Sequence, residues 1–244
     1  MISDAETMTD ARPKRLRMSP DARRADILDA ALALFYSRGW DHVTVADVLQ
    51  EAGISKGGFY HHFTAKEDLL DGLIARFTAE ALAAAETVRD ATTGTALDRF
   101  KAFLAETGRF TAARVPQIKF LIDVMLRPGN DLLFHRITAA TNAAARPVLR
   151  EMIAQGVADG SFDVPDIDLV TETIVAMSAG RRQHLLDAVA DIDRGDLDAA
   201  VARLDRRMVG EGVVIDRLLG LRAGTVVLCN AGEHRRMLEA IAAG

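Results

Sequence analysis

The chain has 244 residues, of which 49% are hydrophobic, 27% are charged and 5% are aromatic. This balance is that of a globular protein, and it excludes a disordered, collagen-like or low-complexity chain. The single cysteine, Cys229, excludes an intramolecular disulfide and a zinc site built from several cysteines. We expect Cys229 to be a small core residue, with a redox-sensing thiol as the alternative.

The sequence contains no signal for insertion into a membrane or for secretion. No apolar run approaches the roughly 18 residues that a membrane-spanning helix requires. The first twenty residues carry several charges and lack the apolar segment of a secretory signal. We therefore expect a cytoplasmic protein that has no membrane partner.

The positive charge is concentrated near the amino end. Six Lys and Arg residues and one Asp lie between Arg12 and Arg24, a local charge of +5. Because the whole chain carries −5, the remainder carries −10. A basic amino-terminal segment on an otherwise acidic chain is typical of a protein whose amino-terminal part contacts a polyanion, although a solvated tail would have the same composition.

The first elements are bounded by recognisable capping residues. Residues 1–18 are polar and are expected to form a flexible basic arm. Ser19 and Pro20 suit the N-cap and the first position of a helix over 20–38, and Gly39 suits its end. Further capping residues then introduce two shorter helices.

Thr44, with Asp47 three residues later, begins a second helix that ends near Gly53. Ser55 caps a third helix that continues to about His62. Two short helices joined by a tight turn that contains glycine are typical of a helix-turn-helix.

The rest of the chain has helical periodicity almost throughout. Thr64 and Glu67 form a capping box that begins a fourth helix, and Pro147 lies inside a later helix that it could kink. Glycine and proline predict breaks at 92–94, 116, 128–129, 160–165, 195 and 210–212, and the only strand-like run is 225–229. The sequence thus predicts an all-α protein with an arm (1–18), a helix-turn-helix domain (19–65) and a larger helical bundle (66–244).

The third helix has two chemically distinct faces. At about 100° per residue, Phe59 and Phe63 point toward the other helices, whereas Gly57 and His61 point outward. Two consecutive glycines cost a helix on the order of 1 kcal/mol each relative to alanine. Close approach of the backbone to a large partner would explain why Gly57 and Gly58 occur there. In a helix-turn-helix this helix enters the major groove of DNA.

Residues 24–66 resemble the DNA-binding domain of the TetR family of transcriptional regulators. The resemblance rests on a dense set of matches: Phe35, Gly39, Thr44, Val45, residues 52–55, residues 57–60, Phe63 and residues 66–69. It implies a homodimeric, cytoplasmic repressor whose carboxy-terminal helical domain binds a small-molecule inducer. The resemblance covers roughly the first quarter of the chain, so it transfers no ligand-pocket residues.

The resemblance also implies which residues contact DNA. Thr44 and Tyr60 correspond to phosphate contacts, Lys56, Gly57 and His61 to positions that read or approach the bases, and Lys66 to a position near the DNA backbone. The complete set of expected DNA contacts is Thr44, Ser55, Lys56, Gly57, Gly58, Tyr60, His61 and Lys66. Thr44 and Ser55 could instead serve only as caps, Tyr60 could pack, and His61 could be an ordinary surface histidine.

We expect no catalytic residue, metal ligand or cofactor. Residues 53–57 match G-x-S-x-G, but a nucleophile elbow requires a strand before its serine, and none is predicted. His61 and His62 are adjacent on a helix, so their rings diverge. A helical enzyme or small-molecule binder remains the alternative, although we find no acid–base or metal constellation in the body of the chain.

The carboxy-terminal bundle offers candidates for a ligand pocket, with ordinary core packing as the alternative. The apolar candidates are Phe103, Phe110, Phe120, Met125, Phe134 and Met177. Polar groups that could orient a ligand are Arg109, His135, Asn142, Gln183 and His184.

Two amphipathic regions near the carboxy end could pair with their copies around a two-fold axis, or could face their own core. The first has a stripe formed by Ile167, Val170, Ile174, Met177, Leu185 and Ile192. The second contains Val214, Leu218 and Leu221.

Together these features predict a repressor that presents two reading helices to a palindromic operator, in major grooves roughly 34–36 Å apart. A ligand that favours a different spacing would release it. Activation, or regulation without a ligand, would use the same helix-turn-helix.

Overall fold

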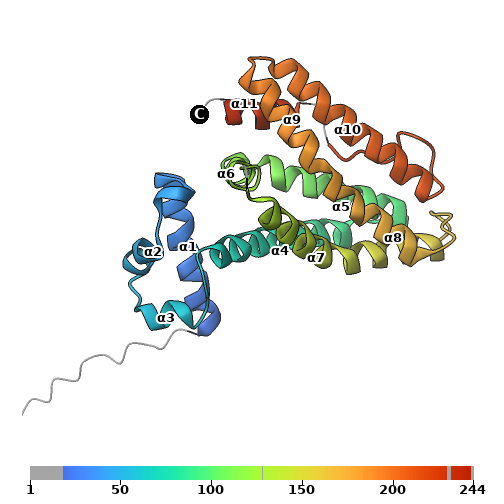
Figure 1. Ribbon diagram of the computed structural model, residues 1–244. Helices are drawn as coiled ribbons and strands as arrows, with labels where there is room; N and C mark the ends of the chain where they lie inside the picture. Colours follow the sequence, from blue (N-terminus) through green and yellow to red (C-terminus); the bar gives the residue numbers. More distant parts are fainter. Residues whose placement is uncertain (1–18, 128, 230–231, 243–244) are drawn as a thin grey trace, which may run out of the picture. The chain divides into compact units, whose positions relative to one another are not determined.

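The structure is a computed structural model that describes residues 19–127, 129–229 and 232–242. The described residues form helices without strands, which confirms the predicted all-α fold (Figure 1). The chain divides into two compact units between Leu69 and Leu70. The expected arm, 1–18, lies outside the described residues. Among the described helices, none combines the length and the apolar character needed to span a membrane.

Within the described residues, four helices of the first unit end before the division between Leu69 and Leu70, and a fifth helix crosses it. They are α1 (Pro20–Arg38), the 3-10 helix η1 (Trp40–His42), α2 (Val45–Glu51) and α3 (Lys56–Tyr60), followed by α4 (Glu67–Ala91), whose first turn contains the boundary. The second unit continues with α5 (Ala96–Ala112), α6 (Val115–Met125), α7 (Asp131–Ala158), α8 (Ile167–Ala176), η2 (Met177–Gly180), α9 (Arg181–Asp193), α10 (Leu197–Leu218) and α11 (Glu233–Ala242). Pro147 lies inside α7, as expected.

The caps of the first unit largely follow the sequence signals. The Ser19 hydroxyl accepts a hydrogen bond from the Ala22 N–H at 3.1 Å, and Gly39 ends α1 with a φ of 79°. Thr44 and Asp47 form the predicted capping box at the start of α2. α3 ends at Tyr60, about two residues earlier than predicted.

The predicted pairing of Thr64 with Glu67 is wrong. The Asp68 carboxylate accepts instead, from the Thr64 N–H at 2.7 Å, from its hydroxyl at 2.5 Å and from the Ala65 N–H at 3.1 Å. The helix that follows consequently begins at Glu67 and not directly after Thr64.

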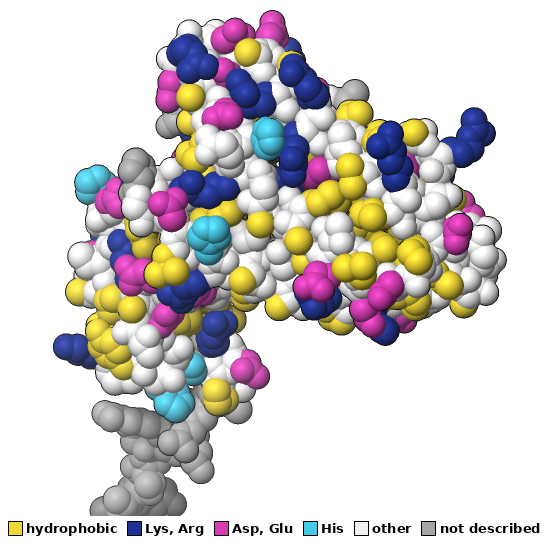
Figure 2. Space-filling model, turned by 45° about the vertical axis from the view of Figure 1, so that its right-hand side comes forward, with side chains coloured by type: hydrophobic (Ala, Val, Ile, Leu, Met, Phe, Trp, Pro, Cys, Tyr) yellow, Lys and Arg dark blue, Asp and Glu magenta, His cyan; other side chains and the backbone are white. Residues whose placement is uncertain are grey.

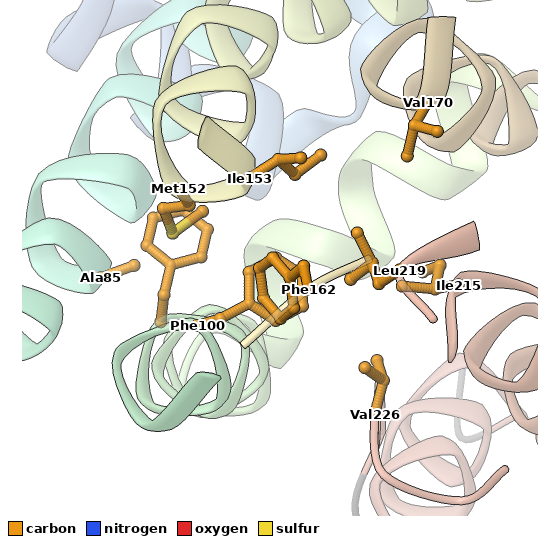
Figure 3. Packing of buried hydrophobic residues seen from close by; sticks show 10 residues of the cluster. Ala85, Phe100, Met152, Ile153, Phe162, Val170, Ile215, Leu219 and Val226 are labelled. Carbon is orange, nitrogen blue, oxygen red and sulfur yellow. The ribbon is translucent and has the colours of Figure 1, made fainter. Parts of the chain in front are cut away.

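Aromatic and aliphatic side chains from distant helices form the main core of the second unit (Figure 3). Phe100 of α5 packs against Phe162, which follows α7, with ring centroids 5.6 Å apart in an edge-on arrangement. Gly156 has no side chain because the Phe162 ring occupies that space. Ile153 and Leu219 complete the centre of this core with almost no exposed surface.

The hydrophobic stripe that was considered for pairing between subunits faces its own core instead. Ile167, Val170, Ile174 and Met177 belong to or pack against the main core, as do Leu218 and Leu221. Leu185 and Ile192 pack against a second cluster, formed by Ala188, Ala200, Val201, Leu204 and Leu238. Among the residues named for the two regions, Val214 is exposed.

The predicted break at residues 210–212 is also wrong, because α10 continues through both glycines. A Cβ added at Gly212 would lie 2.6 Å from the Val226 carbonyl oxygen, whereas one added at Gly210 would meet no atom within 4 Å. Gly212 therefore permits a close approach of the following segment to α10 and does not end the helix.

The strand-like run at residues 225–229 forms no strand, because its first backbone donors are bonded elsewhere. The buried Asp216 carboxylate accepts hydrogen bonds from the N–H groups of Gly224 (2.7 Å), Thr225 (3.1 Å) and Val226 (2.9 Å). These bonds fix the segment against α10. The side chain of Val226 is buried in the main core.

Substitution of Gly212 tests this close approach. Gly212→Ala should lower the free energy of unfolding by about 1–3 kcal/mol, because the new methyl group overpacks against the Val226 carbonyl. Gly210→Ala is the matched control and should raise stability by up to about 1 kcal/mol, as for an exposed helical glycine. Denaturant unfolding of both variants measures the difference, and equal stabilities would contradict the packing described.

Candidate nucleic-acid interface and ligand cavity

The short helix α3 is fixed to the first unit by two phenylalanines. Phe59 has no exposed surface and Phe63 has 2%, and their ring centroids are 5.6 Å apart. The guanidinium of Arg24, on α1, lies 5.0 Å from the centre of the Phe63 ring. Burial of these rings determines which face of α3 is directed toward solvent.

The opposite face of α3 carries most of the predicted DNA contacts at the surface. Ser55, Lys56, Gly57 and His61 are exposed, Tyr60 is 48% exposed, and Gly58 is half-buried. Figure 2 shows histidine side chains at the surface of the first unit. This face therefore presents an ammonium group, a phenol, an imidazole and bare backbone together.

Lys56 and Tyr60 lie one helical turn apart and next to each other. The Lys56 ammonium is 6.0 Å from the centre of the Tyr60 ring. The Ser55 hydroxyl accepts a hydrogen bond from the Gly58 N–H at 3.1 Å, so it can still donate its own hydrogen. These groups can supply both positive charge and hydrogen-bond donors to a phosphate.

The hydroxyl of Thr44 already has a partner within the protein. It donates to the Asp47 carboxylate at 2.5 Å and accepts from the Asp47 N–H at 3.2 Å. The hydrogen bonds from Thr44, together with nearby Arg38 at 3.1 Å, hold the pKa of Asp47 below its ordinary value. Contact between the Thr44 hydroxyl and a phosphate would require this hydroxyl to exchange its partner.

Lys66 is directed into its own domain. Its ammonium donates to the Trp40 carbonyl and lies 4.2 Å from the centre of the Trp40 ring. Burial lowers the pKa of Lys66 despite the nearby Glu67 carboxylate. Trp40 could not be identified from the sequence, because no local pattern connects it with a lysine 26 residues later.

Neither glycine of α3 is required by close packing within the protein. A Cβ at Gly57 would meet no atom within 4 Å, and one at Gly58 would make ordinary contact with the Ser55 hydroxyl at 3.4 Å. Both glycines lie outside the left-handed backbone region. The low helix propensity of these two residues therefore has no internal structural compensation.

The second unit contains a cavity of about 460 Å³. Leu104, Thr107 and Thr111 of α5 form one side, and Leu204 and Met208 of α10 form part of another. The other lining residues are Gly108, Ala112, Ile122, Arg181, His184, Leu185, Arg207, Leu228, Cys229, Glu233, His234, Arg236 and Met237. A mostly apolar wall with a few polar groups is typical of a small-molecule site.

None of the six apolar residues predicted for a pocket lines this cavity. Those six are Phe103, Phe110, Phe120, Met125, Phe134 and Met177. Phe103, Phe110 and Phe134 are buried, and Met177 packs against the main core. Among the predicted polar groups, His184 does line the cavity. The contribution of α11 was missed, because its residues approach α5 and α10 only through the folded chain.

Two guanidinium groups of the cavity wall are held by one buried carboxylate. The Arg181 Nε lies 2.9 Å from the Glu211 carboxylate, and the Arg207 Nε lies 2.7 Å from it. Although burial alone raises the pKa of Glu211, the two arginines outweigh it and the pKa is lowered. Glu211 is thus the charged centre that positions this side of the wall.

Sequence comparison identifies the family of the amino-terminal part. Residues 27–73 match the family described as bacterial regulatory proteins, tetR family. The repressor KstR2 of Mycolicibacterium smegmatis is 29% identical over 150 residues, which cover 62% of this chain and 72% of the relative. KstR2 of Rhodococcus jostii is 44% identical over 55 residues, which cover 22% and 27% of the two chains.

Solved structures share the fold over most of the chain. A putative TetR-family transcriptional regulator from Syntrophomonas wolfei has a TM-score of 0.57 at 19% identity, covering 84% of this chain and all of that one. The fatty acid degradation regulator FadR from Bacillus halodurans has a TM-score of 0.52 at 19% identity, covering 81% and 97%.

The matched segment, 27–73, contains α2, α3 and most of α1, the elements that build the exposed face described above. Proteins of this family are transcriptional regulators and not enzymes, in agreement with the sequence analysis. Residues 27–73 thus form a DNA-binding domain of the tetR family type, and the chain that carries it is a DNA-binding transcriptional regulator.

Proposed function

We propose that the protein is a homodimeric repressor that binds a palindromic operator through α3 and is released by a small molecule held in the cavity. The exposed face of α3, opposite the buried Phe59, is the observation that carries the proposal. Because this protein acts on bacterial operator DNA in our account, we place it in the cytoplasm.

The DNA contacts divide into two kinds. Lys56 and Tyr60 supply charge and a hydroxyl to phosphates, which gives affinity and register but little sequence information. His61 can donate to or accept from a base edge, and the bare backbone at Gly57 permits close approach. We retain Thr44, Ser55 and Gly58 as supporting contacts. For Lys66 we propose only that it lies near the DNA backbone, at the start of α4, because its ammonium already binds the Trp40 carbonyl.

Repression is favoured over activation by the named relatives. The two KstR2 proteins are described as transcriptional repressors, and one of them aligns over 150 residues of this chain. Expression of a reporter gene in a strain that lacks the protein distinguishes repression from activation. Loss of a repressor raises expression, and loss of an activator lowers it.

The cavity supports release by a small molecule. Its volume of about 460 Å³ falls within the range of about 300–1,000 Å³ that is typical of small-molecule sites. Arg236 and His184 are polar groups that could orient an occupant. A ligand needs only about 1.4 kcal/mol of coupling to weaken DNA binding tenfold.

Hydrophobic side chains on the outer surface of the second unit support pairing between two copies. Leu169 of α8 and Val209 and Val214 of α10 are exposed, although neighbouring residues of both helices are buried. Figure 2 shows hydrophobic side chains gathered on this unit. Where exposed apolar side chains gather in a patch, the patch commonly marks a surface that a partner covers.

Charge removal on α3 tests the DNA interface. Lys56→Ala should weaken operator binding by about tenfold and reduce the salt dependence by about one ion, because a phosphate contact is lost. Lys101→Ala removes the same charge from an exposed position of α5 and should leave the affinity unchanged. Fluorescence anisotropy at several salt concentrations measures both quantities. Equal affinities for the two variants would refute the assignment of Lys56.

A charge on the proposed pairing face tests the dimer. Val209→Glu should convert the dimer to a monomer without unfolding it, because Val209 is 68% exposed in the single chain. Leu132→Glu is the matched control, since Leu132 is 73% exposed on α7, a helix that contributes no residue to the proposed face. Sedimentation velocity gives the mass of each variant. A monomeric wild type, or a dimer that survives Val209→Glu, would contradict the proposed face.

A further inference from the structure

Three potential metal ligands from different segments meet beside the cavity. They are Asp205 of α10, Cys229 in the segment before α11, and His234 in the first turn of α11. Their ligand atoms all lie within 4.8 Å of one another. The His234 Nδ1 is 2.6 Å from the Asp205 carboxylate and 3.6 Å from the Cys229 sulfur.

We propose that Asp205, Cys229 and His234 bind one divalent transition-metal ion of the zinc type, with a fourth coordination position that faces the cavity. Cys229 and His234 both line the cavity wall, so an additional donor can approach from that side. Three protein ligands and one exchangeable position form a recognised arrangement for zinc.

The distances suit tetrahedral coordination. Bonds of about 2.3 Å to sulfur and about 2.0 Å to nitrogen place those two atoms about 3.5 Å apart around a tetrahedral ion. The observed separation of 3.6 Å between the Cys229 sulfur and the His234 nitrogen already matches this value. The carboxylate of Asp205 is half-exposed, so it can move the short distance that replaces its hydrogen bond with a metal bond.

The same geometry argues against a catalytic triad. In a Cys–His–acid triad, one ring nitrogen of the histidine faces the thiol and the other faces the carboxylate. Here the single atom Nδ1 of His234 faces both Cys229 and Asp205. Convergence of three donor atoms on one point is the arrangement that an ion requires.

The polypeptide holds these residues in place before any ion binds. Leu204 and Leu238 belong to one hydrophobic cluster, which fixes the register of α10 against α11. Arg235 forms an ion pair with Asp198 between the same two helices. The segment that leads to Cys229 is fixed to α10 by the three backbone hydrogen bonds to Asp216.

The donor set favours a borderline or soft ion over magnesium or calcium, which prefer oxygen ligands alone. Coordination exchanges the S–H bond of Cys229 for a sulfur–metal bond, and the thiol proton passes to solvent without oxidation or reduction. The His234 ring binds through Nδ1 and keeps its hydrogen on Nε2. The Glu233 carboxylate, 3.3 Å from the sulfur, adds negative charge that offsets the charge of the ion.

Titration of the reduced full-length protein with Co²⁺ tests the site. Because Cys229 is the only cysteine in the sequence, a thiolate-to-cobalt charge-transfer band identifies this residue directly. We expect the band to saturate at one ion per chain and to disappear when Zn²⁺ is added, while excess Mg²⁺ leaves it unchanged. Absence of the band at saturating Co²⁺ would overturn the proposal.

Variants separate the three-residue site from binding by the thiol alone. Cys229→Ser should abolish the band, and Asp205→Asn and His234→Ala should each weaken Co²⁺ binding by at least about tenfold, since loss of even an outer partner has such an effect. His42→Ala is the control, because His42 is exposed in the first unit and lies outside the cavity wall. A band with unchanged Co²⁺ affinity in both Asp205→Asn and His234→Ala would also overturn the proposal.

Circular dichroism verifies that each variant is folded, and Asp205→Asn provides a test at a half-exposed position if His234→Ala is unstable. The site lies in the second unit and none of its residues belongs to α3. Failure of metal binding is therefore distinguishable from failure of the proposed DNA binding, which is measured on operator DNA.

Discussion

Burial of Phe59 against Phe63 is the constraint on which the proposed DNA-reading surface depends. A helix of five residues has few hydrogen bonds of its own, so its orientation comes from the side chains that it buries. Once Phe59 is fixed, the helical repeat places Gly57 and His61 on the opposite side, with Lys56 and Tyr60 at the surface. The hydrophobic core of the first unit thereby determines which groups a DNA groove can meet.

In the second unit, buried carboxylates hold the cavity wall and the segment before α11 in place. Asp216 accepts three backbone hydrogen bonds, and Glu211 holds two arginines that form part of the cavity wall. Both carboxylates lie on α10, so this helix organises the segment before α11 and the polar side of the cavity. A change in the position of α10 would therefore displace both the segment before α11 and the polar side of the cavity.

The sequence predicted features that depend on local signals. Ser19, Gly39, Thr44 and Ser55 marked helix boundaries, because capping is an interaction within four residues. The outward direction of Gly57 and His61 followed from the helical repeat once Phe59 was recognised as the buried side.

Long-range contacts were not predictable from such signals. Gly212 was interpreted as a helix break, because nothing near it in the sequence indicates that the Val226 carbonyl requires its space. The apolar stripe of α8 and α9 was considered for pairing, although its residues complete their own core. The cavity wall was missed because it combines α5, α9, α10 and α11, and periodicity within one helix does not show which other helices it contacts.

The most direct test of the reading surface is substitution of Gly57 by alanine, with folding stability and operator affinity measured on the same variant. Because the position is helical and open to solvent, we expect a gain of up to about 1 kcal/mol in the free energy of unfolding. We also expect about tenfold weaker operator binding, because the methyl group prevents the close approach of the backbone to DNA that glycine permits. A stabilised protein with undiminished operator affinity would show that the Gly57 backbone does not approach DNA.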